Sequence, residues 1–134
     1  MSGMGVLMWL ACQTGPSTDK TTAQLASETR STSPLEMSVQ TFHPISKDAV
    51  IIDVRTDQEY NSGHVPNARH IPLNALQSQL PSLSQDLDEA IYFICASGVR
   101  SAKAAQMAHA HGYTKAINIK DGTYGWRSAG FPLE

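Results

Sequence analysis

The chain has 134 residues, a length that corresponds to one domain rather than two. Hydrophobic residues make up 41% and charged residues 16%, which is typical of a globular protein and unlike a disordered or fibrous one. The formal net charge is -2 and Lys and Arg form no cluster, so the composition argues against a surface for nucleic acid or anionic lipid.

The N-terminal segment Met4–Cys12 is almost entirely apolar. It is shorter than the roughly 20 residues of a transmembrane helix, but it has the length of the apolar part of a secretory signal. Its ending, Leu-Ala-Cys, resembles the lipobox of bacterial lipoproteins, although Trp9 and Leu10 differ from the favoured residues and no Lys or Arg precedes the run. We expect residues 1–12 to be a signal peptide ending at a lipid-attachment cysteine, Cys12, which places the protein in the periplasm or cell envelope. The alternative is a cytoplasmic protein with an apolar N-terminus.

Residues 13–34 are rich in Ser, Thr, Gly and Pro and contain almost no large apolar side chains. Such a segment buries too little surface to offset the entropy lost on ordering, so we expect a flexible polar linker. The globular domain is then predicted to span residues 35–134. A linker directly behind a lipidated Cys12 would tether this domain to a membrane.

The first half of the domain carries three local signals. Val39–Phe42 is predicted to be a short edge strand, and the apolar, β-branched run Ala49–Val54 a buried strand. Thr56 and Glu59 form the T-x-x-E pattern of a capping box, which predicts a short helix from Thr56 toward Ser62 that ends at Gly63.

The second half continues the alternation of helix and strand. Leu76–Leu87 is predicted to be helix or turn, interrupted by Pro81. Ala90–Cys95 and Ala116–Ile119 are apolar runs typical of buried strands. Ser101–His111 is rich in Ala, Lys, Gln and Met, which favours a helix that Gly112 ends.

Strands that alternate with helices pair in parallel through right-handed crossovers. The sequence therefore predicts an α/β fold with a central, mostly parallel sheet of about five short strands and helices on both faces. Ligands of such sheets bind at the carboxyl ends of the strands, and Cys95 lies at the end of one predicted strand.

The loop that follows Cys95 has the composition of an anion cradle. Small residues let the backbone curl around the cysteine sulfur, and Gly98 permits unusual dihedral angles. Inward-pointing N–H groups and the positive end of the next helix then favour the thiolate, which is the nucleophilic form. Arg100 adds a permanent positive charge. We therefore predict that Cys95 is the nucleophile and that its anion nest consists of Ala96, Ser97, Gly98, Val99, Arg100 and Ser101.

A buried, inert cysteine that packs at a strand end is the alternative interpretation of Cys95. The alternative interpretation of Arg100 is a solvated side chain at the start of a helix, with no role in binding. The combined pattern of strand, cysteine, glycine, arginine and helix favours a functional site over both.

Four separated motifs, in this order, resemble the rhodanese family: I-I-D-V-R at Ile51–Arg55, E-Y-N-S-G-H-V-P-N-A-R-H-I-P at Glu59–Pro72, C-A-S-G-V-R-S at Cys95–Ser101, and D-G-T-Y-G-W-R-S-A-G-F-P at Asp121–Pro132. The resemblance covers the chain from Ala49 to its C-terminus. Asn67 stands where the family usually has Gly, and Thr123 replaces the second Gly of the closing motif.

The resemblance implies a rhodanese-like fold and a sulfurtransferase, for which we expect no cofactor. No Cys/His cluster has the spacing of a zinc site, so we expect no metal either. Cys95 would take sulfur from a donor such as thiosulfate or a persulfide, become a persulfide, and pass the sulfur to cyanide or a thiol, including that of a thioredoxin-like protein. It also implies that Asp53 and Arg55 support the site through polar contacts, and that His64 is a structural residue of a turn rather than a catalytic base. Trp126 and Phe131 are expected to pack in the core.

Two alternatives remain at this stage. A Cys-dependent phosphatase or arsenate reductase is disfavoured because the loop has six residues from Cys95 to Arg100, whereas related phosphatases have one more. A non-catalytic rhodanese-like module for binding, sulfur delivery or sensing is disfavoured because such modules usually lose the cysteine. Because Ala96 leaves Arg100 as the one side-chain cation in the loop, we expect weaker binding of thiosulfate than in loops with a second cation.

Overall fold

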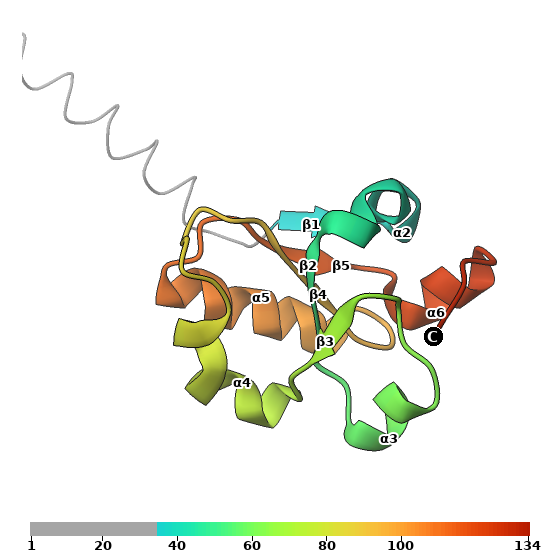
Figure 1. The fold of residues 1–134 in the computed structure, drawn as a ribbon, viewed down its shortest axis with the longest axis horizontal. Coiled ribbons are helices and arrows are strands. Elements are labelled where there is room, and N and C mark those ends of the chain that lie inside the picture. Colours follow the sequence, from blue (N-terminus) through green and yellow to red (C-terminus); the bar gives the residue numbers. More distant parts are fainter. Residues whose placement is uncertain (1–34) are drawn as a thin grey trace, which may run out of the picture. The chain divides into compact units, whose positions relative to one another are not determined.

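The structure is a computed structural model that describes residues 35–134. Five parallel strands form one sheet in the spatial order β1-β5-β4-β2-β3 (Figure 1). The strands are β1 (Leu35–Met37), β2 (Val50–Asp53), β3 (Ala68–His70), β4 (Ile91–Ile94) and β5 (Ala116–Ile119). The predicted α/β fold with a parallel sheet is confirmed.

Helices cover both faces of this sheet. The α-helices are α2 (Val39–Phe42), α3 (Asp57–Asn61), α4 (Leu73–Gln79), α5 (Val99–His111) and α6 (Gly122–Ser128), and the 3-10 helices are η3 (His43–Asp48) and η4 (Leu80–Ser82). One apolar cluster joins α4, η4 and α5 to one face of the sheet, and a second joins α2 and α6 to the other face. In β2, Ile52 belongs to the first cluster and Ile51 to the second, as the two-residue period of a strand requires. Both faces are therefore buried, which explains why the strands are continuous apolar runs.

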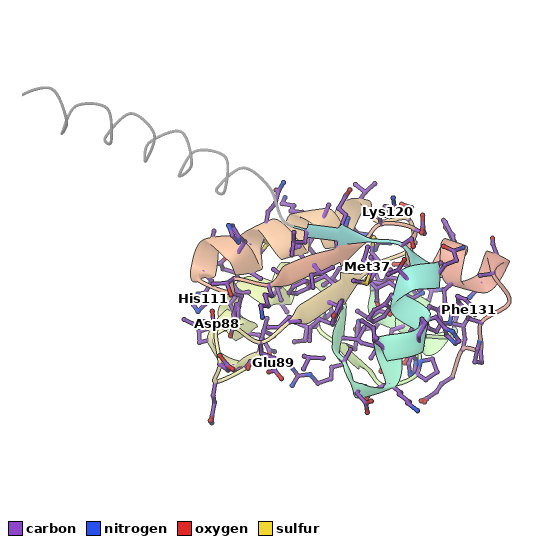
Figure 2. The ribbon with its side chains drawn as sticks, turned by 90° about the horizontal axis from the view of Figure 1, so that it is seen from above. Met37, Asp88, Glu89, His111, Lys120 and Phe131 are labelled. Atoms are coloured by element: carbon purple, nitrogen blue, oxygen red, sulfur yellow. The ribbon has the colours of Figure 1, made fainter. Side chains whose placement is uncertain are left out.

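The register of the central strands positions the site. Asp53 of β2 pairs with Ile94 of β4, and the N–H of Val54 donates to the Ile94 carbonyl at an N–O distance of 3.0 Å. The residues after Asp53 and the residues after Ile94 therefore leave the sheet side by side at its carboxyl edge. Figure 2 shows this edge near Met37 and Lys120, at the opposite end of the domain from Asp88, Glu89 and His111.

Several elements lie where local signals predicted them. The Thr56 side chain accepts from the N–H of Glu59, and the Glu59 carboxylate accepts from the N–H of Thr56, so the capping box of α3 is confirmed. Strand β5 has the predicted bounds. Helix α5 ends at Gly112, which adopts a φ of 127°, but it begins at Val99, two residues before the prediction.

The prediction of an edge strand over Val39–Phe42 is wrong. This segment is α2, because the Ser38 side chain accepts from the N–H of Thr41 and caps a helix start. Val39 and Phe42, three residues apart, both turn into the core. The edge strand is instead β1, which pairs with β5.

Other boundaries also differ from the sequence-based expectation. β3 and α6 were not predicted at all, since β3 is only three residues long and α6 contains two glycines. Pro81 lies in η4, and the helix before it, α4, ends at Gln79. A proline ring at this position forbids a further α-helical turn.

No helix within residues 35–134 is long and apolar enough to cross a membrane. The predicted signal segment, Cys12 and the predicted linker lie outside the described residues.

Candidate active site

Cys95 is the first residue after β4 and is 1% exposed. Its sulfur accepts a hydrogen bond from the backbone N–H of Gly98, with an N–S distance of 3.1 Å, and lies 3.4 Å from the Ser101 hydroxyl oxygen. Burial raises the pKa of the Cys95 thiol, but hydrogen bonds from Ser101, Ser97 and Gly98 outweigh burial and hold the pKa below its ordinary value. The donors around the sulfur therefore favour the thiolate.

Two glycines allow the loop to be this tight. Gly98 has a φ of +94°, and a Cβ atom there would overlap the Lys120 carbonyl oxygen. Gly122, at the start of α6, has a φ of +64°, and a Cβ atom there would overlap the Ala96 carbonyl oxygen. Any larger residue at either position would push the loop away from the segment after β5.

Helix α6 fixes the orientation of the loop peptides. The N–H of Thr123 donates to the Cys95 carbonyl at 2.8 Å, and the N–H of Tyr124 donates to the Ala96 carbonyl at 3.0 Å. These two carbonyls point toward α6, away from the sulfur. Because the C=O and N–H of one peptide group point in opposite directions, the N–H groups of the same peptides face the sulfur. This role of Gly122, Thr123 and Tyr124 was not predicted from the sequence. The available signal was the closing motif that begins at Asp121.

A buried asparagine connects the loop to β5. The Oδ1 atom of Asn118 lies 2.6 Å from the Ser101 hydroxyl oxygen, and its Nδ2 atom donates to the Gly98 carbonyl at 3.2 Å. Since the Ser101 hydroxyl has one proton, Asn118 and the Cys95 sulfur compete for the same donor. Asn118 was missed from the sequence, although a polar residue within the apolar run A-I-N-I was a usable signal.

Arg100 is paired with Glu59 of α3. Its Nη1 and Nη2 atoms donate to Glu59 Oε1 and Oε2 at 2.8 and 3.0 Å, a bidentate geometry. The hydrogen bonds from Arg100 lower the pKa of Glu59 to about 2, and those to Glu59 raise the pKa of Arg100. The arginine predicted to bind the donor thus ties the active loop to the capping box of α3. Glu59 was identified only as a capping residue, because the capping pattern already accounted for it.

Asp53 and Arg55 form a buried pair beside the loop. The Arg55 guanidinium donates to the Asp53 carboxylate from Nε at 3.0 Å and from Nη2 at 2.8 Å, and Nη2 also donates to the Gly63 carbonyl. His70 lies 2.8 Å from the Arg55 carbonyl oxygen through Nε2. These polar contacts hold the segment after β2 in place next to the segment after β4.

His64 lies in the turn after α3, where its backbone exchanges two hydrogen bonds with Glu134 and its ring contacts Tyr60 of α3. Its ring stacks on Tyr60 with centroids 3.8 Å apart, and Nδ1 lies 3.1 Å from the Tyr60 carbonyl oxygen. Trp126 is buried, its ring lies against Phe131, and its indole N–H donates to the Pro132 carbonyl. Within residues 35–134, no group of three or more His, Cys, Asp and Glu side chains could hold a metal ion.

A groove of about 940 Å³ opens beside the loop, between the start of α3, the start of α4 and one side of α5. Arg100 belongs both to the loop and to the wall of this groove. The groove is lined by Val54, Arg55, Thr56, Asp57, Gln58, Pro72, Leu73, Asn74, Gln77, Arg100, Lys103 and Met107. Lys103 is a third cation in the groove wall, after Arg55 and Arg100, and it was not predicted because it lies beyond the loop motif.

Residues 40–129 match the family model of the rhodanese-like domain. The chain belongs to this family. A curated relative named "Sulfurtransferase" from Allochromatium vinosum is 30% identical over 88 residues, which are 66% of this chain and 80% of the relative. The structure of the human single-domain sulfurtransferase TSTD1 has a TM-score of 0.63 and 28% identity, covering 72% of this chain and 97% of that one.

The rhodanese-like domain also occurs in larger proteins. The tRNA uridine(34) hydroxylase of Salmonella typhimurium is 34% identical over 94 residues, but the match covers 64% of this chain and only 27% of the hydroxylase. The family and the sulfurtransferases within it support a sulfurtransferase type of activity for this rhodanese-like domain.

Proposed function

We propose that this protein moves a sulfane sulfur from a donor such as thiosulfate or a persulfide to a thiol or cyanide, through a persulfide on Cys95. The observation that carries the proposal is the hydrogen bonding of the Cys95 sulfur by the N–H of Gly98, with the Ser101 hydroxyl beside it. Those donors lower the pKa of a buried thiol, and a thiolate is the form that attacks sulfur.

In the first step the Cys95 thiolate attacks the outer sulfur of the donor. With thiosulfate, a bond forms between the Cys95 sulfur and the outer sulfur, the sulfur–sulfur bond of thiosulfate breaks, and sulfite leaves with the electron pair. The product is the persulfide of Cys95. The loop N–H groups stabilise the charge on the transferring sulfur, as an oxyanion hole stabilises a developing oxyanion.

In the second step an acceptor attacks the outer sulfur of the persulfide. With cyanide, the carbon–sulfur bond of thiocyanate forms and the Cys95 thiolate leaves; with a thiol, the acceptor becomes the persulfide. Charge and electrons balance in both steps without an oxidant or a reductant. The acceptor is a small thiol or the thiol of a thioredoxin-like protein.

The alternative of a non-catalytic sulfur-delivery module shares the first step and differs in the second. Val99 of the loop and Tyr124 of α6 are large apolar residues that are 74% and 62% exposed. Both side chains lie on segments that contact the Cys95 loop, so they are accessible to a protein acceptor. A phosphatase is disfavoured by the six-residue spacing from Cys95 to Arg100.

Intact mass spectrometry of the full chain after incubation with thiosulfate tests the proposal. We expect an increase of about 32 Da, one sulfur atom, that peptide mapping assigns to Cys95 and that cyanide removes. Cys95→Ser is the matched control, since the near-isosteric hydroxyl preserves the fold but cannot carry sulfur. Thiocyanate formation by Cys95→Ser at the parent rate would refute a persulfide on this residue.

A further inference from the structure

Asn118 is a polar side chain in an otherwise apolar strand, β5. All four residues of this strand are buried, and Asn118 is 1% exposed. A buried amide is costly unless its polar atoms are hydrogen-bonded, and both ends of this amide have partners. The partners, Ser101 and Gly98, also contact the Cys95 sulfur. The Asn118 amide therefore binds the groups that surround the nucleophile.

The orientation of the Asn118 amide follows from the atoms around it. The Gly98 carbonyl oxygen lies 3.2 Å from Nδ2, and Oε2 of the Glu36 carboxylate lies 3.4 Å from the same nitrogen. A carbonyl and an ionised carboxylate only accept hydrogen bonds, so the reverse orientation would place Oδ1 against two acceptors. Nδ2 therefore faces Gly98 and Glu36, and Oδ1 faces Ser101.

This orientation determines where the Ser101 proton lies. Oδ1 of Asn118 carries no proton, so the Ser101 hydroxyl donates to it, at an O–O distance of 2.6 Å. The same hydroxyl oxygen lies 3.4 Å from the Cys95 sulfur. Rotation about the Cβ–Oγ bond redirects the proton from one acceptor to the other without moving the oxygen. Because the hydroxyl has one proton, the thiolate gains this hydrogen bond only when the bond to Asn118 breaks.

The backbone donors to the sulfur face no such competition. The Gly98 N–H donates to the sulfur at 3.1 Å, and the Ser97 N–H also lowers the pKa of Cys95. The Ser101 hydroxyl lowers that pKa further, and its competing bond to Asn118 limits the effect. The nucleophilicity of an ionised thiol falls as its pKa falls, so a thiolate that binds this hydroxyl less strongly attacks faster.

We propose that Asn118 is a positioning residue for the capture of sulfur, which holds the Ser101 proton away from the Cys95 thiolate and so keeps that thiolate a strong nucleophile. The inference rests on the proposed function and leaves unchanged the bonds that form and break in its two steps. In the first step the thiolate attacks, and in the second step it leaves. A less stabilised thiolate attacks faster and leaves more slowly, so Asn118 speeds the first step and slows the second.

Asn118→Leu tests this assignment, because leucine has nearly the shape of asparagine without its polar atoms. The Gly98 carbonyl keeps its hydrogen bond from the Ala102 N–H at 3.1 Å, so the loop stays attached to α5. The readout is alkylation of the full chain by iodoacetamide as a function of pH, followed on the peptide that carries Cys95. The midpoint reports the pKa of Cys95, and the plateau at high pH reports the nucleophilicity of the fully formed thiolate.

In Asn118→Leu the alkylation midpoint should fall by about 0.5 to 1 pH unit, because the freed hydroxyl donates to the thiolate. The plateau rate constant should fall about 2- to 3-fold, since nucleophilicity decreases with the pKa of the thiol. Single-turnover experiments above the midpoint pH should show slower formation of the Cys95 persulfide from thiosulfate. Discharge of that persulfide to cyanide should be faster, because a thiolate of lower pKa leaves more readily.

Three further variants separate this role from a merely structural one. Asn118→Asp keeps an oxygen that accepts from Ser101, so its midpoint should stay at or above the parent value. In a Ser101→Ala background, Asn118→Leu should cause no further shift. Ile117→Leu is the matched control, an apolar substitution on the opposite face of β5, and its midpoint should equal that of the parent.

A midpoint in Asn118→Leu at or above the parent value would overturn the assignment, because a loop that merely loosens loses donors and raises the pKa of Cys95. An equal shift with and without the Ser101 hydroxyl would overturn it as well. Asn118→Asp is an independent test, since a midpoint below the parent value would contradict retention of the proton by residue 118. If thiosulfate forms no persulfide on Cys95 of the parent, the proposed function fails, whereas the alkylation result is unaffected.

Discussion

The guanidinium of Arg100 faces the carboxylate of Glu59 with both nitrogen–oxygen distances at or below 3.0 Å. Glu59 also closes the capping box of α3, so one carboxylate joins the helix start to the active loop. The pair ties the active loop to α3 and uses one N–H of each terminal nitrogen of the guanidinium.

Replacing Glu59 with Gln should release Arg100. We expect the KM for thiosulfate to fall several-fold, because a freed guanidinium attracts the dianion. Steady-state kinetics with thiosulfate and cyanide measure the change, with Glu89→Gln, an exposed carboxylate at the far end of the sheet, as the charge-matched control. A KM in Glu59→Gln equal to that of the control would show that the released arginine does not reach the donor.

The same pair predicts a pH dependence of stability. Glu59 has a folded-state pKa of about 2, below the ordinary value near 4.3, so the ionised form is favoured by folding. Its contribution to the free energy of unfolding is complete above about pH 4.3 and is lost as the pH falls toward 2. Urea unfolding of the parent and of Glu59→Gln between pH 2 and 6 should give curves that converge at the acidic end. A constant difference across this range would contradict the assigned pKa.

Removing the Ser101 hydroxyl should make the Cys95 thiol less acidic. Its hydrogen bond is the largest of the effects that lower the pKa of Cys95, so Ser101→Ala should move the midpoint of Cys95 alkylation by iodoacetamide to higher pH. Ser97→Ala is the control, because Ser97 acts on the sulfur through its backbone N–H, which the substitution keeps. Ser101→Ala also leaves Asn118 Oδ1 without its donor, which should lower the free energy of unfolding by about 1–3 kcal/mol. An unshifted midpoint would exclude the hydroxyl as a donor to the thiolate.

Gly122→Ala should displace the active loop. The new Cβ would overlap the Ala96 carbonyl oxygen, so the loop and α6 must separate and the hydrogen bonds from Thr123 and Tyr124 weaken. Gly130→Ala is the matched control, since Gly130 has a similar φ of +80° but a Cβ atom there would meet nothing within 4 Å. We expect both variants to lose about 1 kcal/mol to backbone strain, and only Gly122→Ala to lose sulfur transfer. Parallel thermal melts and activity assays separate the two effects.

From the sequence, we propose that Cys12 is lipidated and anchors the protein in the cell envelope. The full chain expressed in a bacterium should then fractionate with membranes, because a lipoprotein cysteine carries several acyl chains. Cys12→Ser should release the protein, because serine has no thiol to be acylated. Mass spectrometry of the N-terminus identifies the modification. Recovery of cytosolic protein with Met1 intact would disprove the anchor.

The sequence by itself determined the features that depend on neighbours along the chain. Apolar runs identified β2, β4 and β5, the T-x-x-E pattern identified α3, and the small residues after Cys95 identified the loop that surrounds its sulfur. Each of these signals lies within a few residues, so no knowledge of the fold was needed to interpret it. The same reasoning failed for Val39–Phe42, where β-propensity competed with a serine cap and the cap prevailed.

The tertiary structure decided which groups meet across the chain. Arg100 and Glu59 are 41 residues apart, and Ser101 and Asn118 are 17 apart, so no local pattern predicts either pair. They meet because the segments that follow β2 and β4 leave the sheet side by side, and because β4 pairs with β5. The structure also showed that Arg100 is already paired with Glu59, and that Lys103 and Asp57 line the same groove. The sequence shows which side chains are charged. Whether a charge is neutralised depends on which distant residue the fold brings within hydrogen-bonding distance.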